Sequence, residues 1–140
     1  MSFLVPEGVP KGILVSVPTL AEYPALLVLC TCPDEAVALD IARVLVKEGL
    51  AACVNRAGPV TSIYQWDGKL CEQPEQLLVI KTLPARYEAL EMRLKALHPY
   101  EIPEIIAIPV VAGSSQYLAW LATATDATTA DPTPLSVHPT

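Results

Sequence analysis

Residues 60–82, VTSIYQWDGKLCEQPEQLLVIKT, predict a long β-hairpin and decide the fold class of the chain. Polar and apolar side chains alternate over Val60–Trp66, with the period of two that is typical of a strand. Asp67-Gly68 then fits a two-residue type I′ turn, which needs positive φ angles at both central positions. The chain returns as a second strand over Lys69–Thr82, in which Pro74 indicates a bulge or a free edge.

Strands and helices alternate around this hairpin. Gly49 is placed to end a helix, and Gly58-Pro59 indicates a bend or bulge just before the hairpin. Apolar runs and helical periodicity predict, in chain order, a strand at Ala25–Thr31, a helix at Asp34–Glu48, a strand at Leu50–Val54 that resumes after the bend as Val60–Trp66, its hairpin partner at Lys69–Thr82, a helix at Leu83–Leu97, a strand at Ile105–Val110 and a helix at Ser114–Leu121. This order predicts an α+β, ferredoxin-like split βαβ fold (βαββαβ) with an antiparallel sheet and an extra C-terminal helix.

The length of 140 residues fits one domain. Proline is frequent near both ends, so we expect an N-terminal extension at 1–24, a folded domain at 25–125 and a flexible C-terminal tail at 126–140. Within the extension, Gly12–Val17 is a candidate for an additional strand or for a segment that lies on a partner.

The composition is unusually apolar, with 52% hydrophobic and 17% charged residues. A membrane span is not expected, because no run reaches the roughly 18 uninterrupted apolar residues that a spanning helix needs. Nucleic acid is not expected as a partner, since nine Lys and Arg stand against fifteen Asp and Glu. The two main helices would cover one face of an apolar sheet, which leaves the other face for self-association without fixing the number of subunits.

The four cysteines are expected to be reduced. The first 24 residues lack the charged and apolar pattern of a secretory signal, which favours a cytoplasmic protein. Cys30 and Cys32 lie two positions apart at the end of a predicted strand, so their side chains share one face. Their Cys-x-Cys spacing differs from the Cys-x-x-Cys of common zinc and redox sites, and free cysteines also pack simply as small core residues.

The densest polar cluster lies between His98 and Glu104, where one imidazole and the carboxyl groups of Glu101 and Glu104 are held between two prolines. Imidazole and carboxylate are suitable metal ligands, and a nearby thiolate would add a soft one. The alternative for His98 is an interaction with the last carbonyls of the preceding helix.

Four aromatic residues are candidates for lining a pocket or a subunit interface, although such residues also pack cores: Tyr64, Trp66, Tyr100 and Trp120. No glycine-rich phosphate loop is present, and no organic cofactor is expected. A Cys–His nucleophile would need an activated thiol and an oxyanion site, for which the sequence gives no sign, so we do not expect an enzyme.

Ordered motifs between about Leu26 and Thr123 resemble the divalent-cation tolerance protein CutA family. They are TCPD at 31–34, GLAACVN at 49–55, TSIYQWDGK at 61–69, IKT at 80–82, HPYEIPEI at 98–105 and YLAWL at 117–121.

The resemblance implies a ferredoxin-like fold assembled as a homotrimer through long hairpin strands, and a role in tolerance of copper or another divalent cation. It implies Cys30, His98 and Glu104 as metal ligands, with Cys32 and Glu101 as further candidates. A second interpretation stays open, in which a trimeric signalling or scaffold protein binds a small molecule or partner protein at clefts between subunits.

Overall fold

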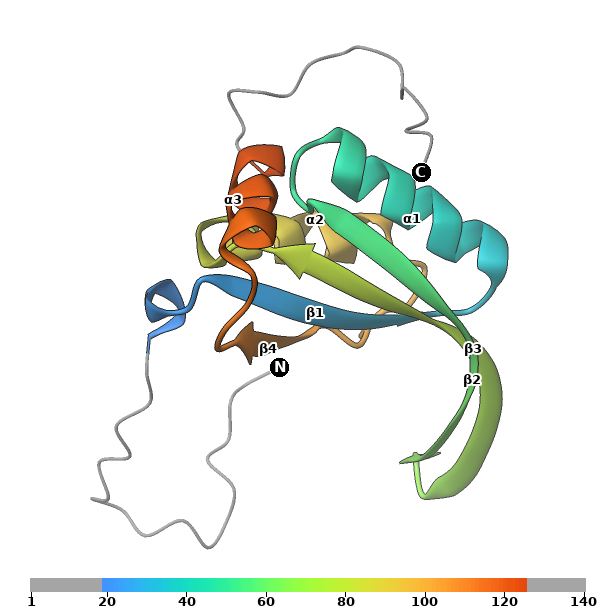
Figure 1. Ribbon diagram of the computed structural model, residues 1–140. Helices are drawn as coiled ribbons and strands as arrows, with labels where there is room; N and C mark the ends of the chain where they lie inside the picture. Colours follow the sequence, from blue (N-terminus) through green and yellow to red (C-terminus); the bar gives the residue numbers. More distant parts are fainter. Residues whose placement is uncertain (1–18, 126–140) are drawn as a thin grey trace, which may run out of the picture.

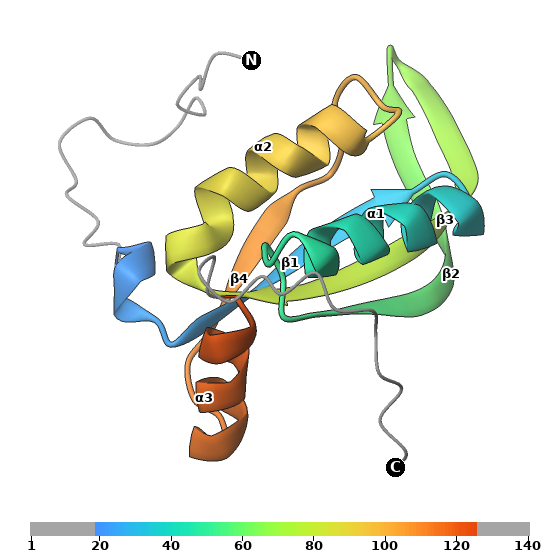
Figure 2. The same cartoon turned by 90° about the horizontal axis from the view of Figure 1, so that it is seen from above.

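The computed structural model describes residues 19–125 as a four-stranded antiparallel sheet with two helices packed on one face (Figures 1 and 2). The expected tail at 126–140 and the candidate strand at Gly12–Val17 lie outside the described residues. No helix within residues 19–125 combines the length and hydropathy needed to span a bilayer.

The order of the elements confirms the predicted α+β, ferredoxin-like class with an added C-terminal helix. The elements are η1 (Leu20–Glu22), β1 (Ala25–Cys32), α1 (Glu35–Lys47), β2 (Cys53–Trp66), β3 (Lys69–Thr82), η2 (Pro84–Arg86), α2 (Tyr87–Leu97), β4 (Ile106–Val110) and α3 (Ser115–Ala124). The strands lie in the order β2-β3-β1-β4, so β1 occupies the centre beside β3 and β4.

The hairpin turn is as predicted. Asp67 and Gly68 have φ angles of 50° and 72°, the positive values that a type I′ turn requires at both positions. The flanking residues Trp66 and Lys69 are paired across the turn.

The bend or bulge predicted at Gly58-Pro59 is confirmed. A single strand, β2, runs over Cys53–Trp66, beginning three residues after the predicted Leu50, and its register shifts between Arg56 and Gly58. A bulge bends a strand without ending its pairing, which explains why the break in the sequence pattern is not a break in the strand.

Pro74 lies at a free edge rather than at a bulge. It pairs with Thr61 in regular register, and the register shift lies elsewhere in the same hairpin. β1 pairs with β3 only between Gln76 and Thr82, so the part of β3 before Gln76 has β2 as its single neighbour in the described sheet. The hairpin therefore extends beyond the rest of the sheet, as Figure 1 shows.

The core lies between the sheet and the helices α1 and α2. Alternate residues of β1 are fully buried on that face, and they meet apolar side chains from both helices: Val28, Cys30, Cys32, Ile41, Leu45, Leu90 and Leu94. α1 begins at Asp34, whose carboxylate accepts a hydrogen bond of 2.8 Å from the Val37 N–H. Arg93 of α2 forms a two-point ion pair with Glu48, which ties the two helices together.

The opposite face of the sheet is apolar and only partly covered. The register places Leu29 opposite Ile106 and Leu27 opposite Ile108, so these four side chains share one face. Ile106 and Ile108 are 51% and 43% exposed. Figure 2 shows α1 and α2 on the other side and α3 at one end of the sheet. This arrangement agrees with the predicted uncovered apolar face.

Candidate metal site

Three of the predicted ligands meet where β1 ends and the loop after α2 begins. The sulfur atoms of Cys30 and Cys32 and a ring nitrogen of His98 all lie within 4.8 Å of one another, and all three residues are buried. Strand alternation points both cysteines toward the helices, and His98 follows directly after the last residue of α2. Sulfur and imidazole nitrogen suit copper or zinc and not magnesium or calcium, so the donor set fits a thiophilic ion.

His98 is held by hydrogen bonds at both ring nitrogens. Nε2 lies 2.8 Å from the Thr31 carbonyl oxygen, and Nδ1 accepts from the Tyr100 backbone N–H at 3.1 Å. A carbonyl can only accept, so this pattern places the ring proton on Nε2. The alternative predicted from the sequence, an interaction of the ring with the last carbonyls of α2, is not found. Only the backbone N–H of His98 bonds to the Leu94 carbonyl, while the ring turns to the Thr31 carbonyl of β1.

The two thiols differ in acidity because they interact with each other. A hydrogen bond from Cys30 lowers the pKa of Cys32. The same interaction raises the pKa of Cys30, and burial and the negative charges of Cys32, Glu104 and Glu75 raise it further. Cys32 is therefore the first of the pair to become a thiolate.

Glu75 and Tyr100 form a second polar contact beside the cluster. The Tyr100 hydroxyl donates a hydrogen bond of 2.9 Å to Glu75, a carboxyl group that is only 8% exposed. The Tyr100 ring also packs on His98, with ring centroids 4.6 Å apart. Burial and, next, the bond to Glu75 raise the pKa of Tyr100. The sequence does not indicate that Glu75 belongs to this site, because the residues around Glu75 resemble those around the exposed Glu72.

The remaining predicted site residues lie apart from the cluster. Glu101 and Glu104 are exposed, and neither belongs to the group of three ligand atoms that the described residues bring together. Glu104 is still near enough for its charge to raise the pKa of Cys30. A ligand role for these two carboxylates stays a prediction.

The predicted aromatic residues divide between the site and the surface. Tyr100 joins the cluster through its contacts with His98 and Glu75. Tyr64 and Trp66 are exposed on the hairpin, and Trp120 is exposed on α3, where its ring lies 5.5 Å from that of Tyr117. These three side chains are therefore available for an interface and do not belong to the core.

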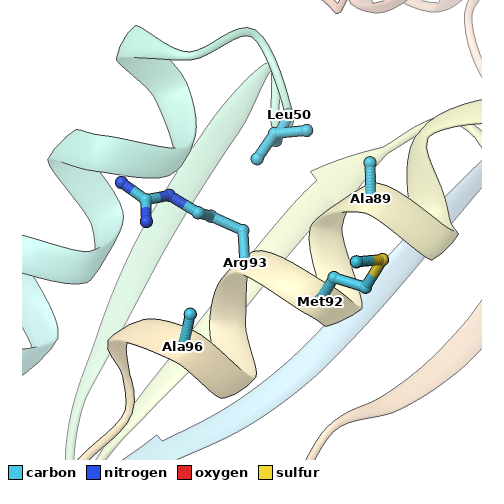
Figure 3. Close-up of a pocket in the computed structure, with 5 residues that line it drawn as sticks. All are labelled: Leu50, Ala89, Met92, Arg93 and Ala96. Carbon is cyan, nitrogen blue, oxygen red and sulfur yellow. The ribbon is translucent and has the colours of Figure 1, made fainter.

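A shallow groove on the outer side of the helix layer is separate from the cluster. Its volume is about 330 Å³, and its lining residues are Leu50, Ala89, Met92, Arg93 and Ala96 (Figure 3). Arg93 is already paired with Glu48, and the lining is otherwise apolar. The only soft ligand atom among its lining residues is the Met92 sulfur, and the groove does not extend the site.

Comparisons with known proteins point to one family. Residues 26–124 match the family model described as CutA1 divalent ion tolerance protein. The chain is 50% identical to the divalent-cation tolerance protein CutA of Thermus thermophilus over 95 residues, which is 68% of this chain and 92% of that protein. It is 47% identical to the human protein CutA over 96 residues, or 69% of this chain and 54% of the human protein.

Solved structures agree with the sequence comparisons. The Thermus thermophilus divalent cation tolerance protein superposes with a TM-score of 0.71 at 48% identity, covering 73% of this chain and 99% of that one. The Archaeoglobus fulgidus protein, described as a periplasmic divalent cation tolerance protein CutA, gives a TM-score of 0.71 at 31% identity over the same shares of the two chains, 73% and 99%.

Proposed function

The chain belongs to the CutA1 divalent ion tolerance protein family, and on that premise we propose that it is a homotrimer that binds copper or another divalent cation. The observation that carries the proposal is the buried group of two thiols and one imidazole, with ligand atoms within 4.8 Å of one another. Sulfur and nitrogen donors of this kind favour copper over the hard cations that prefer oxygen. Glu101 and Glu104 are exposed and lie outside this group, and Glu104 is near enough for its charge to raise the pKa of Cys30.

Copper titration of the reduced protein tests the site. We expect the Cys30→Ala/Cys32→Ala double variant to lose the copper that the wild-type protein binds. Cys53→Ala is the matched control, because Cys53 is also a free cysteine but is not part of the cluster. Equal copper stoichiometry in the double variant and the wild type would place the metal elsewhere.

The proposed trimer rests on surfaces that one subunit leaves uncovered. Ile106 and Ile108 are exposed on the open face of the sheet, and Ile63, Trp66 and Leu70 are exposed on the hairpin. The part of β3 before Gln76 and the outer side of β4 are also unpaired strand edges in the described sheet. Both features favour pairing with further copies. We propose three subunits, the number that the resemblance to the family implies.

Light scattering distinguishes the assembly states. A trimer should have three times the chain mass of 15.0 kDa. A monomer at micromolar concentration would contradict the proposed assembly while leaving the metal site to be judged by the copper titration.

We also propose that the protein is not an enzyme and that it works in the cytoplasm. Cys30 and Cys32 are fully buried, which argues against either as a nucleophile that meets substrate. A site built from two free thiols needs a reducing compartment. Cell fractionation tests the location, and recovery of the protein outside the cytoplasm would contradict it.

A further inference from the structure

We infer that the apolar segment Gly12–Val17 of the N-terminal extension docks along the groove beside α2 that Figure 3 shows. The segment lies outside the described residues, and also outside residues 26–124, the part of the chain that matches the family model. The groove and the metal cluster have no residue in common. The inference therefore concerns an interaction surface that the proposed function does not use.

The groove arises because α2 is apolar on two sides. Leu90 and Leu94 face the sheet and are fully buried in the core. Ala89, Met92 and Ala96 form a second apolar stripe, at the spacing that places side chains on one side of a helix, and this stripe lines the groove. Met92 is 69% exposed. A helix that is apolar beyond its core-facing side is expected to be covered there as well.

The described chain begins close to one end of this groove. Figure 2 shows η1 beside η2, at the start of α2, and the two short helices are in contact. Ala89 follows η2 by about one helical turn. Only Pro18 separates Val17 from Thr19, the first described residue. The segment therefore joins the domain within reach of the Ala89 end of the groove.

The pattern and the length of the segment also fit the groove. Alternate side chains of an extended chain lie on the same side, which places Ile13, Val15 and Val17 together. Leu14 and Ser16 then face away from the groove. The three inward positions span about 13 Å at about 3.3 Å per residue. The two groove alanines are about 10 Å apart along α2, at about 1.5 Å per residue, so the lengths match.

The composition favours the N-terminal segment over the C-terminal tail as the occupant. Four of the six residues in Gly12–Val17 are large and apolar, and they lie next to the described domain. Residues 126–140 have only Leu135 and Val137 as large apolar residues, at least ten positions after Thr125. Since burial of apolar surface is the interaction that this groove offers, the N-terminal segment gains more from docking.

Oxidation of Met92 by hydrogen peroxide, followed by mass spectrometry, measures how well the groove is covered in the full-length protein. A segment docked in about nine molecules of ten leaves Met92 open in the remaining tenth, so oxidation slows about 10-fold. We expect Val15→Asp to remove this protection, because its charge opposes burial in an apolar groove. Ser16→Asp is the matched control, since it adds the same charge on the side that faces away and should keep the slow rate. Equal rates in the wild type and Val15→Asp would overturn the inference.

NMR of the full-length protein labelled at its methionine methyl groups supplies a measurement that needs no variant. Met1 and Met92 are the only methionines, so few signals have to be assigned. We expect nuclear Overhauser contacts between the Met92 methyl group and the methyl groups of Ile13, Val15 or Val17. Contacts with another segment instead, or with none beyond the groove itself, would overturn the inference. Circular dichroism of each variant in the oxidation experiment checks that the fold is kept.

Discussion

Replacing Tyr100 with phenylalanine isolates one hydrogen bond beside the metal cluster. The hydroxyl donates to Glu75 at 2.9 Å, and Glu75 is 8% exposed, so little water can replace the lost donor. Hydrogen bonds to a charged group contribute about 1.5–3 kcal/mol. Because the ring and its packing on His98 are kept, we expect Tyr100→Phe to lower the free energy of unfolding by about that amount, 1.5–3 kcal/mol.

Urea unfolding followed by circular dichroism measures this change. All variants must be compared at one protein concentration, since the stability of an oligomer depends on it. Tyr117→Phe is the matched control, because that ring is exposed on α3. A double-mutant cycle with Glu75→Ala, which removes the acceptor, isolates the pair, and a coupling energy below about 0.5 kcal/mol would refute the reasoning.

The same contact predicts the alkaline behaviour of Tyr100. Burial and then Glu75 raise its pKa, so the folded state favours the neutral hydroxyl. Because folding raises this pKa, the neutral Tyr100 contributes its full stabilisation at pH values below the unfolded tyrosine pKa of about 10. The contribution is lost as the pH rises from there through the higher pKa of the folded state. Tyrosinate absorbance of the wild type minus that of Tyr100→Phe should therefore rise only above the range of an ordinary tyrosine. A difference that titrates at about 10 would contradict the contact.

Three further outcomes follow from the fold. Leu94→Ala should cost about 2–5 kcal/mol in urea unfolding, because Leu94 is fully buried between α2 and the sheet, and a loss under about 1 kcal/mol would show a loosely packed core. Asp34→Ala should cost about 1 kcal/mol through loss of the cap on α1, with Asp34→Asn retaining most of the stability. Alkylation followed by mass spectrometry should modify the half-buried Cys53 before the fully buried Cys32, and the opposite order would show that the site is open to solvent.

Features fixed by neighbouring residues could be predicted from the sequence. Asp67-Gly68 requires a particular turn, Asp34 starts a helix, and the alternation over Val60–Trp66 defines a strand. The placement of Cys30 and Cys32 on one face also follows from local geometry, since every second residue of a strand points the same way.

Features that depend on distant segments could not be predicted. The start of β2 at Cys53 rather than at the predicted Leu50 depends on its pairing with β3. The two hydrogen bonds of the His98 ring depend on how the loop after α2 meets β1. Glu75 becomes buried because Tyr100 approaches it from that same loop, and no local pattern indicates such a contact.

The strand order also has a consequence for the timing of folding. β2 and β3 are joined by a two-residue turn, so the hairpin can form within about 1–10 μs. β4 pairs with β1 across almost the whole domain, as Leu27 meets Ile108, and such non-local pairing is slow. We therefore expect the projecting hairpin of each newly made chain to form before β4 pairs with β1. Correct association of these hairpins then competes with aggregation when the chain concentration is high.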